Sequence, residues 1–158
     1  MDTSFNSGTI QLQIHPILNN QPLVLGQKVF VPLLNDSVQI DRLRFYLSGM
    51  SFSNASNNQE KIEQQFFLID LEYPTSLRRQ LPLKTICQWD SIHFIVGVDS
   101  ATQLKGAQGG DLDPMHGMYW SWRSGYINFK CEGVSSSCPI RNNAFMFHIG
   151  WFQAVNSF

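Results

Sequence analysis

Residues 38–52 read VQIDRLRFYLSGMSF, and their pattern decides the fold class. Apolar side chains recur at close to every second position, at Val38, Ile40, Leu43, Phe45 and Leu47. Successive side chains of a strand point to opposite faces of a sheet, so this spacing predicts a β-strand with one buried face.

Similar runs lie on both sides of this segment, at residues 9–17, 27–34, 63–71, 89–99, 118–133 and 142–152. The run 118–133 fits one long strand, or two with a kink at Gly125. Segment 73–83, YPTSLRRQLPL, is expected to be irregular because prolines lie near both of its ends. About eight short, regularly spaced strands predict an all-β fold, an antiparallel β-sandwich of the immunoglobulin-like type.

Length and composition exclude several classes of protein. With 158 residues and no linker, the chain is expected to form a single domain over residues 1–158. A formal net charge of −1 gives no electrostatic footprint for nucleic acid. No apolar run reaches the roughly 18 residues of a membrane-spanning helix. The N-terminus, MDTSFNSG, lacks the features of a signal peptide, so the protein is either cytosolic or exported with its signal absent from this sequence.

Metal-binding motifs are absent, because the sequence contains no HxH, HExxH or CxxC pair. Any metal site must therefore be assembled from distant segments. His148 is expected to share a strand face with Met146, while His116 lies in the loop DPMHGM. Imidazole with thioether or aromatic neighbours suits copper better than calcium or magnesium.

Cysteines and carboxylates leave alternatives open. Cys131 and Cys138 bracket the Ser-rich loop CEGVSSSC, either as a local disulfide or as two unrelated thiols. Asp99, Asp111 and Asp113 either converge on a cation or act as turn residues whose side chains accept backbone N–H bonds. The turn role is the stronger interpretation.

The run MYWSW, residues 118–122, places Trp120 and Trp122 on one side of a predicted strand. Such a pair is most often core packing, and the other interpretations are a stacking platform or a redox-active indole beside a metal. No GxSxG or catalytic cysteine signature is present, so the protein is not expected to be an enzyme.

Six segments carry a family resemblance: residues 12–26 (LQIHPILNNQPLVLG), 40–52 (IDRLRFYLSGMSF), 66–72 (FFLIDLE), 97–100 (GVDS), 109–133 (GGDLDPMHGMYWSWRSGYINFKCEG) and 142–153 (NNAFMFHIGWFQ). Together they resemble the MbnP-like domain family over nearly the whole chain. The resemblance implies a β-sandwich from an exported bacterial protein, periplasmic or held at the cell surface. It also implies further strands beyond Phe158, so that this domain is expected to be truncated at its C-terminus.

The same resemblance implies a chemistry. Founding members of the family bind copper through histidines near a modified tryptophan, and they are partners of a dihaem peroxidase-like protein that oxidises tryptophan to kynurenine. In this sequence His148 matches the family's histidine block, and Trp120 and Trp122 match its aromatic strand.

Two functional hypotheses follow. The first is an exported metal-binding module that favours copper, with His148 and His116 as ligands and Trp120, Trp122, Asp113 and Asp99 lining the site. The second is a structural or protein- or ligand-binding domain of the same fold without a metal, in which the loop 99–117 contacts the partner or ligand.

Overall fold

The computed structural model describes residues 8–63, 66–121 and 125–150. The fold is all-β and antiparallel, as predicted, with one short α-helix, α1 (Ser100–Leu104), and short 3-10 turns among these residues. The strands are β1 (Gly8–Gln13), β2 (Ile17–Leu18), β3 (Gln21–Pro22), β4 (Lys28–Val31), β5 (Asp36–Ser53), β6 (Gln59–Lys61), β7 (Phe66–Asp70), β8 (Arg78–Leu83), β9 (Ser91–Val96), β10 (Tyr119–Trp120), β11 (Gly125–Ser135) and β12 (Ala144–Gly150). No helix in the described part of the chain is long and apolar enough to cross a membrane.

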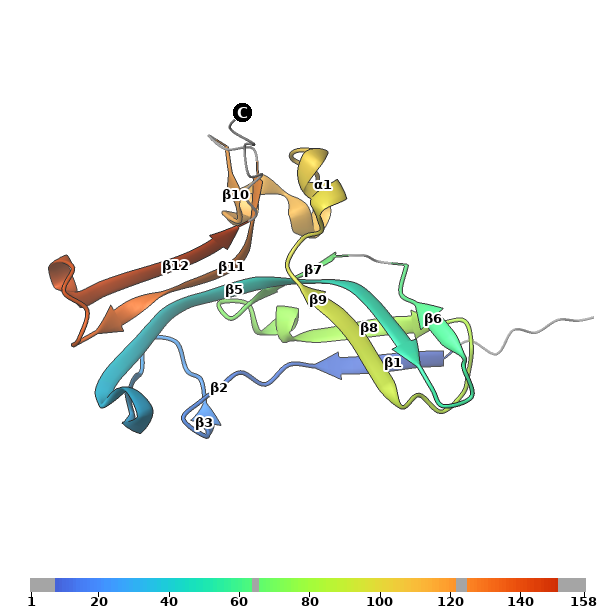
Figure 1. Ribbon diagram of the computed structural model, residues 1–158, viewed down its shortest axis with the longest axis horizontal. Helices are drawn as coiled ribbons and strands as arrows, with labels where there is room; N and C mark the ends of the chain where they lie inside the picture. Colours follow the sequence, from blue (N-terminus) through green and yellow to red (C-terminus); the bar gives the residue numbers. More distant parts are fainter. Residues whose placement is uncertain (1–7, 64–65, 122–124, 151–158) are drawn as a thin grey trace, which may run out of the picture.

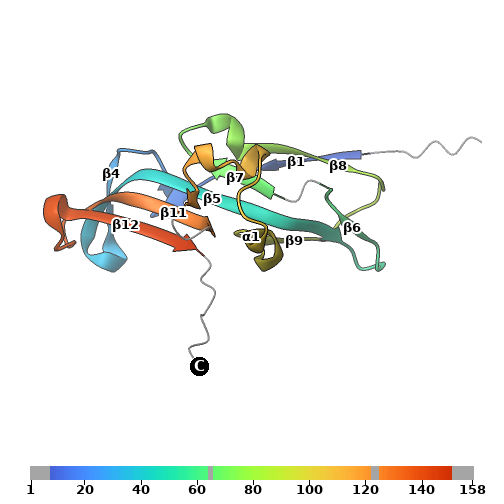
Figure 2. The same cartoon turned by 90° about the horizontal axis from the view of Figure 1, so that it is seen from above.

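Strand β5 contains the decisive stretch and organises the large sheet, running almost the whole length of the molecule (Figure 1). One of its edges pairs first with β11 and then with β9, while the other pairs with β4, β7 and β6 in turn. Strand β12 extends the sheet beyond β11, and Figure 2 shows β12, β11 and β5 side by side.

Two apolar clusters pack on opposite faces of β5 and β7. The first lies between these strands and the two-stranded sheet of β1 and β8, which completes a sandwich (Figure 1). The second contains Tyr46, Leu68 and Tyr126, and it is covered by the segment that carries α1 and the turns up to Met118. Alternation along β5 and β7 therefore supplies both cores, because each strand buries both of its faces.

Segment 73–83 is not irregular as expected, because its second half forms strand β8. Arg79, Leu81 and Leu83 alternate with exposed residues, and Leu81 and Leu83 belong to the first apolar cluster. Pro82 is tolerated because β8 pairs with β1 alone among the described residues, so one of its edges needs no ladder hydrogen bonds.

The run 118–133 forms two strands that pair as a hairpin, and neither one long strand nor two strands joined by a kink at Gly125. Tyr119 pairs with Tyr126, and Trp120 pairs with Gly125. This antiparallel pairing means that the chain reverses direction between Trp120 and Gly125, and β10 lies beside the end of β12 (Figure 1).

Of the two alternatives for Cys131 and Cys138, a local disulfide or two unrelated thiols, the structure has the second, since both are free thiols. The Ser-rich loop between them is instead held by Asp36, whose carboxylate accepts hydrogen bonds from the Ser135 and Ser136 hydroxyls and from the Ser137 amide. The bonds from Ser135 and Ser136 outweigh burial and lower the pKa of Asp36 far below its ordinary value. The loop is therefore fixed by a buried carboxylate.

Candidate functional site

A row of ionisable side chains crosses four neighbouring strands on one face of the sheet. In register they are Asp70 on β7, Arg44 on β5, Lys130 on β11 and His148 on β12. Arg42 and Glu132 occupy the next row, with Glu72 just after β7. We call these seven residues the charged cluster.

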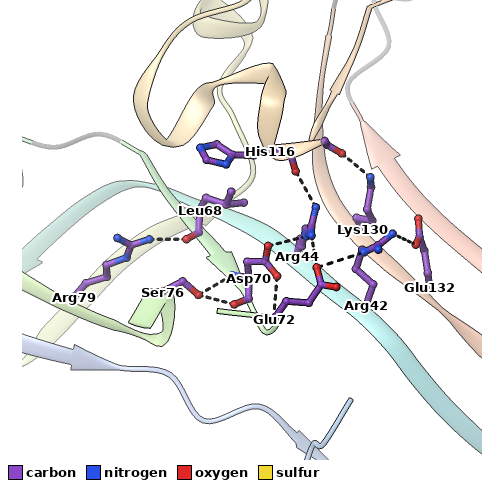
Figure 3. Close-up of polar contacts among 11 residues, drawn as sticks. Arg42, Arg44, Leu68, Asp70, Glu72, Ser76, Arg79, His116, Lys130 and Glu132 are labelled. Carbon is purple, nitrogen blue, oxygen red and sulfur yellow. Dashed lines mark hydrogen bonds and ion pairs between the residues drawn. The ribbon is translucent and has the colours of Figure 1, made fainter. Parts of the chain in front are cut away.

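Arg44 and Lys130 join the cluster to the loop that carries His116. The Nε atom of Arg44 lies 2.8 Å from Oδ2 of Asp70, and its NH2 group pairs with Glu72. Its NH1 group donates a 2.8 Å hydrogen bond to the carbonyl oxygen of His116, as Figure 3 shows. Lys130 Nζ donates to the carbonyl oxygen of Gly117 at 2.5 Å. Two cations of the sheet therefore hold two successive carbonyl groups of the loop.

The outer end of the cluster is a chain of contacts from β12 to β5. His148 Nε2 lies 2.6 Å from Oε1 of Glu132, and the other oxygen of Glu132 accepts a 2.8 Å hydrogen bond from Arg42 NH1. Met146 lies two residues before His148 on the same strand face, and its side chain is largely exposed. A half-buried imidazole and an exposed thioether thus project from the same face of β12, two residues apart.

Trp120 lies close to this strand face. A Cβ atom placed on Gly150 would sit 2.2 Å from Cζ3 of the Trp120 indole, so the ring lies directly over that glycine. Gly150 shares its strand face with His148, two residues away. The late imidazole and the indole are therefore on the same side of the sheet. Trp120 also packs against the second apolar cluster, while Trp122 lies outside the described residues.

Glu132 provides a test of this geometry through acid titration. Burial alone would raise the pKa of its carboxyl, but the hydrogen bond with His148 and the charges of Arg42 and Lys130 hold that pKa below the ordinary value of 4.5. A carboxyl with a lowered folded-state pKa stabilises the fold above its unfolded pKa, and this contribution is lost as pH falls through the folded value.

We expect Glu132→Gln to lower the free energy of unfolding by about 1 kcal/mol at neutral pH. The difference from wild type should shrink as the pH falls below about 4.5, because both proteins then carry a neutral side chain at this position. Urea denaturation at a series of pH values measures it, with the exposed-carboxylate variant Asp41→Asn as the control. A difference that stays constant down to acid pH would contradict the contacts of Glu132.

His116 does not join His148. Its ring lies on the other side of the cluster, with Nε2 3.1 Å from the carbonyl oxygen of Gly110, and it lines a cavity of about 250 Å³ beside Leu68 and Asp70 of β7. Figure 3 shows the ring over Leu68, away from Lys130 and Glu132. Strands β7 and β12 are separated by β5 and β11, so the two imidazoles lie over strands roughly 14 Å apart. The structure does not bring the two predicted ligands together.

Asp99 and Asp113 have local hydrogen-bonding roles. Asp99 caps α1, accepting from the Thr102 amide and hydroxyl at 2.9 Å. Asp113 caps the turn Pro114–His116, accepting from the Met115 amide at 2.8 Å. Asp111 reaches β7, where it accepts from the amide of Leu68. These are the turn and capping roles that short loop carboxylates commonly have.

In the described ranges, no three His, Cys, Asp or Glu side chains are grouped so as to hold a metal ion. A metal at His148 would thus depend on few protein ligands or on a soft donor such as Met146. Sequence reasoning missed Arg42, Arg44, Lys130 and Glu132. Their signal was present, since the pairs Arg42/Arg44 and Lys130/Glu132 each lie two positions apart within predicted strands.

Comparison with known proteins adds independent findings. The family model named MbnP matches residues 7–158. Among solved structures, MbnP from Methylosinus trichosporium is similar with a TM-score of 0.63 at 13% sequence identity. The match covers 90% of this chain and 62% of that one, so this chain spans less than two thirds of the length of the similar structure. No curated protein matches the chain.

Proposed function

The chain belongs to the MbnP family, and from this premise we propose that it is an exported metal-binding β-sandwich module that favours copper, with His148 as a ligand. The observation that carries the proposal is the pair His148–Glu132 beside an exposed Met146. Histidines that bind metals commonly donate their other ring N–H to a carboxylate, which orients the ring and raises its basicity. Glu132 stands in that relation to His148.

The donor set favours a soft ion. His148 offers an imidazole and Met146 a thioether, from positions two residues apart on one strand face. The hydrogen bond to Glu132 uses Nε2 of His148. Nδ1 is therefore the ring nitrogen that would bind a metal, unless the contact with Glu132 breaks. Imidazole and thioether together suit Cu(I), whereas hard cations prefer oxygen ligands. The indole of Trp120 over Gly150 would form an apolar wall on the same side of the sheet.

A competition titration tests the copper proposal. We expect the protein to take up one equivalent of Cu(I) from a colorimetric chelator, and His148→Ala to lose this uptake. Met146→Leu should weaken binding by about tenfold, because it keeps the volume and removes the sulfur. His116→Ala and His93→Ala are matched controls at imidazoles on other elements, and both should bind as wild type does.

Two outcomes would count against this assignment. Uptake that survives in His148→Ala but disappears in His116→Ala would place the metal in the cavity beside β7. Failure of the wild type to compete for Cu(I) at all would leave the metal-free alternative.

A partner belongs to the same proposal. A dihaem peroxidase-like protein would act on a tryptophan near His148, and half-buried Trp120 is the described candidate. Mass spectrometry of the peptide carrying residues 118–123, before and after incubation with such a protein and its oxidant, tests this. An unmodified peptide after incubation would remove the partner from the proposal. Export to the periplasm or cell surface would be tested separately by cell fractionation.

The alternative function is a metal-free protein- or ligand-binding domain. What favours it is the local role of Asp99 and Asp113 and the clamped loop above the sheet, since these features position a segment without needing an ion. The titration above separates the two functions.

A further inference from the structure

A β-bulge interrupts β5 at Gly49. Ser48 pairs with Ile95 and Ser51 with His93, so β5 contains one more residue than β9 between the same two pairs. Gly49 has a φ of +58°, a backbone conformation that residues other than glycine adopt only with strain. On the opposite edge, β7 pairs with β5 up to Ser48 and β6 begins at Ser51. The change of partner from β7 to β6 therefore falls at the bulge, where the Ile62 amide donates a 3.0 Å hydrogen bond to the carbonyl oxygen of Met50.

A cavity of about 460 Å³ lies beside the bulge, and its volume is within the usual size range of small-molecule sites. Its walls include apolar side chains from three segments, namely Met50, Ile62 and Ile95. We call it the Ser48 cavity. It is separate from the charged cluster, because Ser48 and Gly49 lie beyond the part of β5 that pairs with β11.

Ser48 is the unusual member of the lining. Its side chain is only 1% exposed, yet its hydroxyl has no hydrogen-bond partner in the structure. A buried hydroxyl without a partner costs free energy, and buried polar groups are nearly always satisfied. An unsatisfied hydroxyl in the wall of a cavity therefore points to a ligand atom as its partner.

Asp99 supplies a negative charge to the same cavity. Burial alone would raise its pKa, but the hydrogen bonds from the Thr102 amide and hydroxyl hold the pKa below its ordinary value, so the carboxylate is ionised at neutral pH. The Thr102 amide and hydroxyl bond to different oxygens of this carboxylate, the backbone amides of Asp99 and Ala101 also contribute, and a carboxylate oxygen can accept more than one hydrogen bond. At the rim, Glu63 is paired with Lys84 at 2.7 Å, and Lys61 is exposed.

We propose that the Ser48 cavity binds a small organic amine with an apolar body. The ammonium group donates hydrogen bonds to the carboxylate of Asp99 and to the hydroxyl oxygen of Ser48. The hydrocarbon part contacts Met50, Ile62 and Ile95. The site is independent of copper, and it gives the module a second, organic ligand.

Calorimetric titration with hexylamine tests the proposal, with hexanoate and hexanol as probes of equal chain length and different charge. We expect hexylamine to bind about tenfold or more tightly than either probe, because only the cation pairs with Asp99. Asp99→Asn should abolish this preference for the cation. Asparagine is also a good N-cap, so α1 is retained. Asp113→Asn makes the same change outside the cavity and should bind hexylamine as wild type does.

Ser48→Ala separates a ligand site from a packing role. Removing an unsatisfied buried hydroxyl should raise the melting temperature of the free protein and at the same time weaken hexylamine binding several-fold. Equal affinity for hexylamine and hexanoate, an unchanged affinity in Asp99→Asn, or no binding of hexylamine by the wild type would each overturn the proposal.

Discussion

Gly133→Ala is expected to destabilise the protein by about 3 kcal/mol or more, the largest effect of any glycine substitution in the large sheet. Gly133 lies at an irregularity in the pairing of β11 with β5, between Glu132 and Gly133. A Cβ atom there would lie 2.0 Å from the backbone carbonyl oxygen of Gln39 and 2.9 Å from Cζ of Phe145. The phenylalanine ring can rotate, but Gln39 is held in the sheet by both β4 and β11. Strand β11 would have to leave β5 to accept the methyl group.

Urea denaturation monitored by tryptophan fluorescence measures the effect. Gly109→Ala is the matched control, because a Cβ atom at Gly109 meets nothing within 4 Å and its φ of −97° is open to alanine. The control should change the free energy of unfolding by no more than about 0.5 kcal/mol. If Gly133→Ala unfolds at the same urea concentration as the control, then β11 and β5 are not in the register that builds the charged cluster.

Alternation in the sequence was sufficient to predict the fold class and most of the longer strands. The decisive stretch at residues 38–52 forms most of β5. The same logic applied to residues 142–152 placed Met146 and His148 together on one face of β12, which the structure has. Strand β8 was missed because its prolines were weighed more heavily than the spacing of Arg79, Leu81 and Leu83. Edge position, which makes a proline acceptable in a strand, is not visible in a single sequence.

What alternation cannot predict is which strands become neighbours. Both His148 and His116 are candidate imidazole ligands, but two strands lie between β12 and β7, over which they are placed. The distance between the two rings depends on the pairing order β7–β5–β11–β12. The bulge at Gly49 was equally hidden, since glycine at that position fits a turn or a close contact as well as a bulge. The contacts that build the site are long-range, whereas the pattern that predicted the fold is local.

Arg44→Met is expected to lower the free energy of unfolding by about 3 kcal/mol. The methionine keeps most of the side-chain volume but leaves the carboxylate of Asp70 without the cation 2.8 Å away, in a position where its side chain is only 7% exposed. Breaking a buried ion pair from one side costs more than removing both charges, because the remaining charge stays desolvated. The carbonyl oxygen of His116 loses its charged donor as well. Urea denaturation at neutral pH measures the loss.

Lys84→Met is the control for this prediction, because Lys84 and Glu63 form an ion pair whose side chains are 76% and 77% exposed. Pairs of that kind contribute about 1 kcal/mol or less.

The double variant Arg44→Met/Asp70→Asn should recover part of the stability, since no unpaired charge then remains buried. Hydrogen exchange should report faster opening of the loop around His116 and Gly117 in both Arg44 variants, because Lys130 alone would then hold it. The prediction is contradicted if Arg44→Met lowers the free energy of unfolding no more than Lys84→Met does. The loop would then be positioned by its own turns and by the second apolar cluster, and the charged cluster would contribute only surface electrostatics.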